Sequence, residues 1–476
     1  MSNLSATKST GIAAKNTFAD TQKSHHFLSI RVSSNSYFAA LFLTTFFSGF
    51  LIYLEKDWAG SLLFTISWLS FPILAWTDQI TFDGKRLIRT GLLPRAWAWI
   101  NNFRYRLKLS AVEQVETRAL RPQKRGGNVF YRYQTTFQGR GIKITFVSGG
   151  KEYRQIVRAI FPILPENMLD NCSLELRDYL SKPKETLLKA GFAKIPSVKV
   201  LESSLNELYN LNKHSQKRNE NKQINGAEIE EADYLHRLAN ELRLSGYFLQ
   251  SLEAFRRALS LTPRNAWLLF DFARCLHSFA GFEHNWKLKR KAFAILRLAE
   301  RREQNDSEIL VRLGESYFEY GDWRRAQVMF HKSIETAGDN FRAVRGLAEI
   351  ALLQGKIAHV IHHFSNAHRL TNTPALKRWT KSESEYFSKL STDENYMEME
   401  ISRVKMLESL ERSQKTCLMI TLFGFPPIIF GVMLDENLIA NLGWAISCMA
   451  LLIWVSMIVS RNLLAMRVPL DFGDED

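Results

Sequence analysis

Four uninterrupted apolar runs constrain this chain more than any other feature. They form two pairs, residues 37–54 with 60–77 and residues 416–434 with 438–460, and none of the four contains Asp, Glu, Lys, Arg or His. At about 1.5 Å of rise per helical residue, each run is long enough to cross most of the roughly 30 Å hydrocarbon core of a bilayer. The runs therefore predict four transmembrane helices in two hairpins, at 37–77 and 416–460.

The charges that flank these runs predict their orientation. The connectors inside the hairpins are acidic or balanced, whereas the outer flanks carry basic residues: Lys8, Lys15, Lys23, Arg31, Arg461 and Arg467. By the positive-inside rule, both termini and the whole of 78–415 are expected in the cytoplasm. The segment 1–36 is expected to be disordered and basic, and 461–476 to be a C-terminal tail. A segment this long ahead of the first run, with no small-residue cleavage site, argues against a signal peptide. The layout favours a bacterial inner membrane.

Composition and charge exclude several other classes. The chain has 476 residues, 46% of them hydrophobic, with a net charge of +15, so it is not a disordered chain. Its four cysteines lie far apart without a CxxC pair, which argues against a disulfide scaffold or a cysteine zinc module. Charge-free spans favour anchors over an ion pathway. Small residues such as Ser67, Gly424 and Gly431 allow close helix packing. A homo-oligomer and a contact with a membrane partner are therefore both retained as interpretations.

Residues 78–180 follow a different, alternating pattern. Segments rich in Ile, Val, Phe, Tyr and Thr are separated by glycine-containing turns, which predicts an antiparallel sheet with one buried face. The expected strands are 79–83, 86–91, 103–109, 128–137, 142–147 and 152–159. A closing helix is expected at 165–180, beginning at Pro165.

The order of a membrane hairpin, short strands and a closing helix resembles bacterial pleckstrin-homology-like domains that follow paired transmembrane helices. The segments FDGKRLIR (82–89) and LSAVEQVE (109–116) carry this resemblance. Lys and Arg outnumber Asp and Glu about two to one in this module, which suits contact with anionic lipids. A solvated basic face is the equally weighted alternative, and nucleic-acid binding is not expected because none of its motifs appears. The candidate lipid-binding residues are Lys85, Arg86, Arg89, Arg104, Arg106, Lys108, Lys124 and Arg125.

A polar segment leads into a repetitive region. Residues 181–231 are expected to be a linker, most polar at 213–228, with a short helix at 201–211. The segments 307–340 and 341–374 then align with a period of 34, and 232–265 repeats the same pattern. Leu313, Gly314, Tyr317, Gly321, Ala326 and Phe330 correspond to Leu347, Ala348, Ala351, Gly355, Val360 and Phe364. The unit 266–306 has about seven extra residues near 279–289, and a degenerate fifth unit is expected at 375–390.

These units resemble the tetratricopeptide repeat (TPR), a pair of antiparallel helices that stacks into a superhelix. The resemblance implies that 232–390 is an all-α array whose concave face binds extended peptides or partner helices. Carried over position by position, it nominates these partner-binding residues: His236, Asn240, Arg243, Arg274, His277, Glu315, Phe318, Arg342, Arg345 and Glu349. For each one alone, a solvated or packing role is the competing interpretation.

The remaining segments carry no catalytic signature. Residues 391–415 have helical spacing and are expected to continue as a stalk into the third span. No phosphate-binding loop, nucleophile elbow or zinc-protease motif appears, so neither an enzyme nor a cofactor is expected. His359 and His363 stand four residues apart, but no acidic or cysteine partner lies nearby in the sequence, and no metal site is predicted.

Together the patterns describe a multi-domain membrane protein with two membrane hairpins, a small antiparallel β module and an all-α repeat array. The expected function is a membrane-anchored scaffold that recruits protein partners through its repeats at the cytoplasmic face. The alternatives are a regulator that responds to lipid or envelope state, and an accessory subunit of a transport or envelope-biogenesis complex.

Overall fold

The structure is a computed structural model, which describes residues 28–32, 35–95, 106–120, 132–148, 151–202, 226–303 and 305–465. The chain divides into two compact units. The first comprises 1–33 and 76–302, and the second comprises 34–75 and 303–476. Each unit is described by itself.

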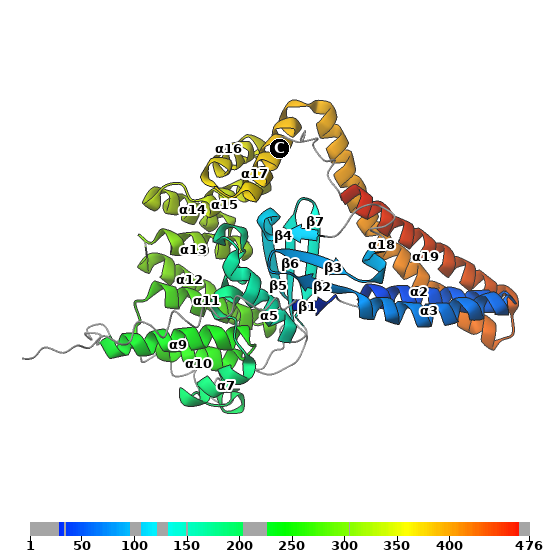
Figure 1. The fold of residues 1–476 in the computed structure, drawn as a ribbon, viewed down its shortest axis with the longest axis horizontal. Helices are drawn as coiled ribbons and strands as arrows, with labels where there is room; N and C mark the ends of the chain where they lie inside the picture. The colour runs from blue at the N-terminus through cyan, green and yellow to red at the C-terminus, as the bar shows by residue number, and fades with distance from the viewer. Residues whose placement is uncertain are drawn as a thin grey trace, which may run out of the picture. The chain divides into compact units, whose positions relative to one another are not determined.

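The β module of the first unit consists of two antiparallel sheets (Figure 1). The first has the order β1 (Leu28–Arg31), β2 (Gln79–Phe82), β3 (Arg86–Thr90) and β4 (Arg106–Lys108). The second consists of β5 (Gln114–Leu120), β6 (Arg132–Gly139) and β7 (Ile142–Val147). Ile80, Leu87, Phe137 and Phe146 are almost fully buried. The alternation that predicted half-buried strands is thus confirmed for β2, β3, β6 and β7.

Several elements of this module differ from the sequence-based expectation. Residues 28–31, within the N-terminal segment expected to be disordered, form β1, which pairs with β2. Residues 152–159, expected to be a strand, lie within helix α5 (Lys151–Ile160), so that prediction is wrong. The buried residues of α5 are Tyr153, Ile156, Val157 and Ile160, a helical spacing that brings them to one face. Strand β5 is not among the predicted strands.

The closing helix of the β module is shorter than expected. Pro165 precedes only a 3₁₀ turn at Glu166–Met168, and α6 spans Asn171–Tyr179. Asp170 caps α6, because its carboxylate accepts a hydrogen bond from the backbone N–H of Ser173 at 2.9 Å. The expected linker also begins with a helix, α7 (Pro183–Phe192). The expected helix at 201–211 falls mostly outside the described residues.

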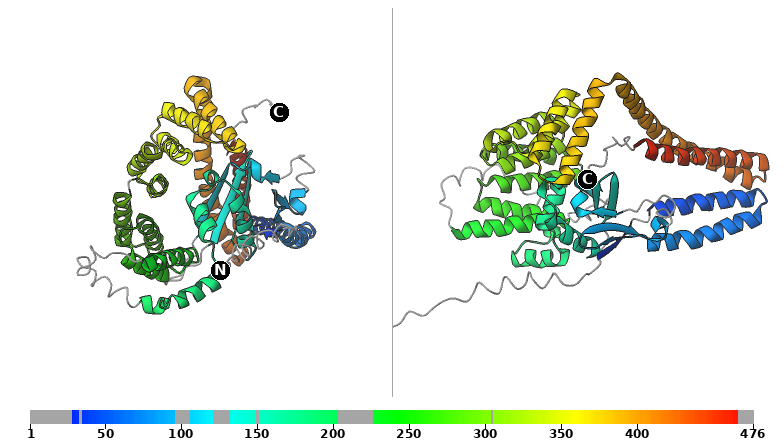
Figure 2. Two further views of the ribbon diagram at one scale, coloured as in Figure 1. Left: turned by 60° about the vertical axis from the view of Figure 1, so that its left-hand side comes forward. Right: turned by 45° about the horizontal axis from the view of Figure 1, so that its top comes forward.

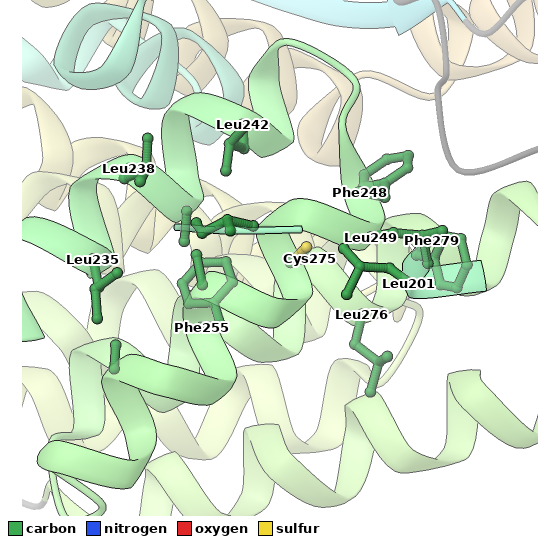
Figure 3. Close-up of a cluster of buried hydrophobic side chains, with 14 of the residues drawn as sticks. Leu201, Leu235, Leu238, Leu242, Phe248, Leu249, Phe255, Cys275, Leu276 and Phe279 are labelled. Carbon is green, nitrogen blue, oxygen red and sulfur yellow. The ribbon is translucent and has the colours of Figure 1, made fainter. Parts of the chain in front are cut away.

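Two helix pairs complete the first unit: α9 (Gly226–Leu244) with α10 (Phe248–Leu261), and α11 (Ala266–Phe282) with α12 (Trp286–Arg302). Their shared core is drawn in Figure 3, where Leu238, Phe255 and Cys275 come from three different helices. The extra residues of the second pair lengthen its helices, because α11 and α12 have 17 residues each whereas α13 and α14 have 13 and 15. The turn between α11 and α12 keeps its length.

The second unit continues the same alternation with α13 (Ser307–Glu319), α14 (Trp323–Ala337), α15 (Phe341–Leu353), α16 (Ile357–Leu370) and α17 (Pro374–Thr392). The Phe330 ring of α14 lies between two glycines. A Cβ on Gly314 would approach this ring to 2.6 Å, and a Cβ on Gly346 would come closer still. Gly314, a small residue of the repeat pattern, and Gly346 therefore make room for one large side chain. The TPR-like architecture predicted from the 34-residue period is confirmed at the level of paired helices.

Helix α18 (Glu394–Met433) joins the repeats to the third apolar run without a break, as the stalk prediction required, and α19 (Asn437–Ala465) returns alongside it. The other apolar pair is α2 (Asn35–Tyr53) and α3 (Asp57–Thr77), and Figure 2 shows both pairs as antiparallel hairpins. By length and composition, all four are candidate membrane spans.

The two hairpins pack on each other through aromatic side chains. Phe46 of α2 lies 4.7 Å from Trp444 of α19, measured between ring centroids. Within the second hairpin, Gly431 of α18 faces Ala440 of α19 so closely that a Cβ on Gly431 would overlap the backbone of Ala440. Gly431, one of the small residues noted in the sequence, thus serves helix packing inside this chain.

Candidate functional site

Four of the five groove residues nominated in the first two repeats, all except His277, lie in a buried ion cluster. Asn240, Arg243 and Arg274 are each at most 6% exposed. Helix α6 of the β module carries Glu175, and its carboxylate forms an ion pair with Arg243 at 2.9 Å and another with Arg274. A helix of the same chain therefore already contacts this part of the predicted groove.

The cluster continues around Asp271 of α11. This carboxylate meets His236 Nε2 at 2.7 Å and accepts a hydrogen bond from Asn240 Nδ2 at 3.0 Å. Burial alone would raise the pKa of Asp271. The hydrogen bond with His236 and the positive charges nearby outweigh burial, so the pKa falls to about 2. Burial would likewise lower the pKa of Arg243, but the Glu175 charge raises it. Asp271 and Arg243 are therefore both charged at neutral pH. Because both are buried, each needs its own polar or charged partners for the fold to be stable.

His277, the fifth nominated residue in these repeats, has a different environment. Its ring packs edge-on against that of Phe293, with 6.0 Å between the ring centroids. His277 belongs to α11 and Phe293 to α12. The contact therefore gives His277 a packing role between the two helices of one repeat.

The nominated residues of the second unit form a more accessible strip. Glu315 of α13 accepts a hydrogen bond from Arg342 Nε of α15 at 2.8 Å, and Arg345 pairs with Glu349 at 2.9 Å. Arg345 also lies over the ring of Trp379 of α17, 5.2 Å from its centroid. Glu315, Arg345 and Glu349 are half-buried, as is Phe318, one turn beyond Glu315, whereas the side chain of Arg342 is only 9% exposed. We call these residues the α13–α15 strip: Glu315, Phe318, Arg342, Arg345 and Glu349.

The candidate lipid-binding residues divide into two groups. Lys85, Arg86, Arg106 and Lys108 are exposed, and Arg86 lies directly opposite Lys108 in the β3–β4 register. Arg89 instead forms an ion pair with the buried Asp78, with 2.6 Å between Nη2 and Oδ2. Arg89 therefore has a structural partner. Arg104, Lys124 and Arg125 lie outside the described residues.

The histidine cluster offers no metal-ligand set. Across the described ranges, no three His, Cys, Asp or Glu side chains lie close enough together to hold a metal ion. His362 and His363 contact each other edge-on at 5.5 Å, and burial lowers the pKa of His363 to about 4.

The chain is similar to several solved structures. No protein-family model and no curated protein matches the chain. MamA is 16% identical, with 37% of this chain and 95% of that chain covered at a TM-score of 0.26. A thermophilic TPR protein of Thermus thermophilus, TTC0263, is 15% identical, with 42% and 98% covered and a TM-score of 0.28. The Cut9–Hcn1 hetero-tetramer of the APC/C is 12% identical, with 66% and 52% covered and a TM-score of 0.29. The assignment of a repeat architecture is therefore based on the helix pairs of this chain itself.

Sequence reasoning missed Glu175 and Asp271, the two acids that neutralise the first half of the groove. Glu175 lies on α6, about 60 residues before the groove positions of α9, and nothing in its local sequence marks it as buried. Asp271 lies between the apolar positions of the repeat pattern, so its position in the sequence gives no sign of a role in the groove. One signal could have indicated these acids. The predicted groove has an excess of basic residues in the repeats 232–265 and 266–306, and buried basic residues need acidic partners from another part of the chain.

Proposed function

We propose that this protein is a non-enzymatic, membrane-anchored scaffold that binds protein partners through the α13–α15 strip. The proposal places both hairpins in a bacterial inner membrane, with the β module and the repeats on the cytoplasmic side. The observation that carries it is the difference between the two halves of the array. The first half is closed by the chain's own Glu175, whereas the second half presents half-buried charges and an aromatic side chain.

The composition of the strip suggests the kind of partner. Acidic and basic side chains alternate on α13 and α15, and each forms an ion pair that a competing charged group could replace. Phe318 supplies an apolar anchor beside them. An extended peptide or helix with both charges and one large apolar residue matches this pattern.

The membrane part of the proposal rests on composition and continuity. The four candidate spans are free of charged residues over their central runs, and α18 connects the repeats directly to one of them. A continuous helix transmits the orientation of the span to the repeat array better than a flexible linker would. Anchoring would thus present the strip at a defined height above the bilayer.

The test is affinity purification of the full chain in mild detergent, followed by mass spectrometry. The variant Glu315→Ala/Arg342→Ala removes one ion pair from the strip without leaving either charge unpaired. The matched control Arg324→Ala/Glu335→Ala removes the same two charges from exposed positions on α14. We expect partners that are retained by the wild type and the control but lost from the strip variant. Identical partner sets in all three would refute the assignment.

A lipid-responsive regulator is the second candidate. It is favoured by the exposed cations Arg86, Arg106 and Lys108, which the β3–β4 register brings to one face of the first sheet. Partner binding that depends on anionic lipid in the purification would favour this function over a passive scaffold.

A further inference from the structure

A cavity of about 500 Å³, largely open to solvent, lies beside the last turn of α3 in the first unit. It is lined by Arg31, Trp76, Thr77, Gln79, Thr90, Gly91, Leu92 and Arg95. Two of these residues are cations, and none of the described residues that line the cavity is acidic. The volume lies within the range of pockets that bind small ligands.

The strand register explains why these residues meet. Arg31 is the last residue of β1 and lies opposite Gln79, the first residue of β2. Gln79 in turn lies opposite Thr90 at the end of β3. Because facing residues share one side of a sheet, Arg31, Gln79 and Thr90 form a row across three strands. Asp78 belongs to the other side, where Arg89 neutralises it.

Two further contacts shape the cavity. The guanidinium of Arg31 lies over the ring of Trp76, 6.0 Å from its centroid, which keeps this cation near the end of α3. Gly91 lets the chain pack closely at the edge of the cavity, because a Cβ there would lie 3.0 Å from Asp78 Cα and 3.2 Å from Pro94 Cδ. A larger residue at position 91 would have to displace backbone.

The position of the cavity along the chain indicates what could enter it. Arg31 lies four residues before α2 begins, and Trp76 and Thr77 end α3, so the cavity marks where the chain enters and leaves the first hairpin. Trp76 is 65% exposed, and tryptophan is enriched at the level of lipid headgroups. Two arginines and a side-chain amide supply hydrogen-bond donors for phosphate oxygens, whereas the Thr90 hydroxyl already donates to the Gln79 carbonyl at 3.2 Å.

We infer that this cavity binds the phosphate of an anionic membrane lipid through Arg31 and Arg95, with the side-chain amide of Gln79 as a further hydrogen-bond donor. The inference rests on the proposed membrane anchoring of α2 and α3. It names a site that is separate from the exposed cations on β3 and β4.

The test uses the full chain in nanodiscs of phosphatidylcholine, into which phosphatidylglycerol is titrated while bound lipid is counted by native mass spectrometry. The variant Arg31→Gln/Arg95→Gln is compared with the control Arg86→Gln/Arg106→Gln, which removes two exposed cations from the same sheet. Diffuse attraction to an anionic surface accounts for a loss of at most roughly 30-fold for any two basic groups, which is the limit expected for the control. We expect a loss well above roughly 30-fold in phosphatidylglycerol binding for the first variant, because direct hydrogen bonds to the phosphate are lost as well. Equal losses in both variants would mean diffuse surface attraction and would overturn the site.

Two further measurements distinguish a lipid headgroup from a free anion and from a purely structural role of the arginines. Inorganic phosphate is titrated into discs of phosphatidylcholine alone. Phosphate binding that requires Arg31 and Arg95, without any effect of the pair on phosphatidylglycerol, would make the ligand a soluble anion and overturn the lipid assignment. A drop in unfolding temperature of the variant that is the same with and without phosphatidylglycerol would also overturn it, because the arginines would then only support the end of α3. Failure of the proposed anchoring is visible separately, as release of the wild type from membranes by alkaline carbonate.

Discussion

Glu175 provides the sharpest test of how the β module is joined to the repeats. Its side chain and those of Arg243 and Arg274 are each 5–7% exposed, so their charges are poorly screened by solvent. At an effective dielectric of about 20, one ion pair near 3 Å gains on the order of 5 kcal/mol before desolvation is counted. Replacing Glu175 with Gln leaves two buried guanidinium groups undercompensated. We expect a loss of about 3–5 kcal/mol in the opening free energy of this contact.

The assay is hydrogen exchange of the full chain, read by mass spectrometry on peptides from α6, α9 and α11. The expected loss corresponds to exchange that is roughly a hundred-fold to several thousand-fold faster. The control is Glu166→Gln, because Glu166 forms a pair with Arg177 but is 56% exposed, and exposed pairs contribute about 1 kcal/mol or less.

Two results decide whether Glu175 stabilises the contact of α6 with α9 and α11. Equal effects of Glu175→Gln and Glu166→Gln would refute the reasoning. The triple variant Glu175→Met/Arg243→Met/Arg274→Met should recover most of the protection, because an apolar replacement removes all three buried charges at once.

Single sites elsewhere in the chain give four more predictions. The low pKa of Asp271 contributes stability that is present above about pH 4 and lost as the pH falls toward 2. Asp271→Asn should therefore cost about 2 kcal/mol in the free energy of unfolding at pH 7 and make that free energy depend less on pH between about 4 and 2, as acid unfolding of the first unit would measure. Gly346→Ala should destabilise the second unit by about 1–3 kcal/mol, since its Cβ would overlap the ring of Phe330, and thermal unfolding measures the loss. His284 has φ 51° at the turn where the other repeats have glycine, so His284→Gly should raise stability by about 1 kcal/mol, and an unchanged melting temperature would contradict this. Gly431→Leu should separate α18 from α19, which disulfide trapping across the pair would detect as lost cross-linking.

The helices that depend on local sequence patterns were predictable from the sequence. Four charge-free runs correspond to four long apolar helices, and the 34-residue period placed the helix pairs from α9 to α16. Even the extra residues of the unit 266–306 fall where the sequence located them, although they extend α11 and α12 rather than the turn. Local periodicity suffices here because each repeat buries the same face against its neighbour.

The β module was harder to predict because its pairings are not local. Strand β1 pairs with β2 across the whole first hairpin, and no feature of residues 28–31 announces that partner. Helix α5 was misread because Ile156 and Val157 are β-branched, whereas the spacing of Tyr153, Ile156 and Ile160 is helical. β-propensity was given more weight than the period of burial.

The candidate sites were also hard to predict, because their charge partners are distant in sequence. The residue types of the groove were identified, but nothing in the sequence indicates that α6 supplies an acid to Arg243 and Arg274. The sequence likewise gives no sign that Arg89 forms an ion pair with the buried Asp78. Charge partners that are distant in sequence decide which basic residues remain available to ligands.

Site-specific photocrosslinking in native membranes tests the scaffold proposal most directly. A photoreactive phenylalanine analogue replaces Phe318 in the α13–α15 strip, and in a control chain it replaces Val328, which is 49% exposed on α14. The scaffold proposal predicts a discrete protein adduct in the membrane fraction from position 318 and none from position 328. Adducts of equal yield from both positions, or from position 328 alone, would contradict the claim that this strip recruits partners at the membrane.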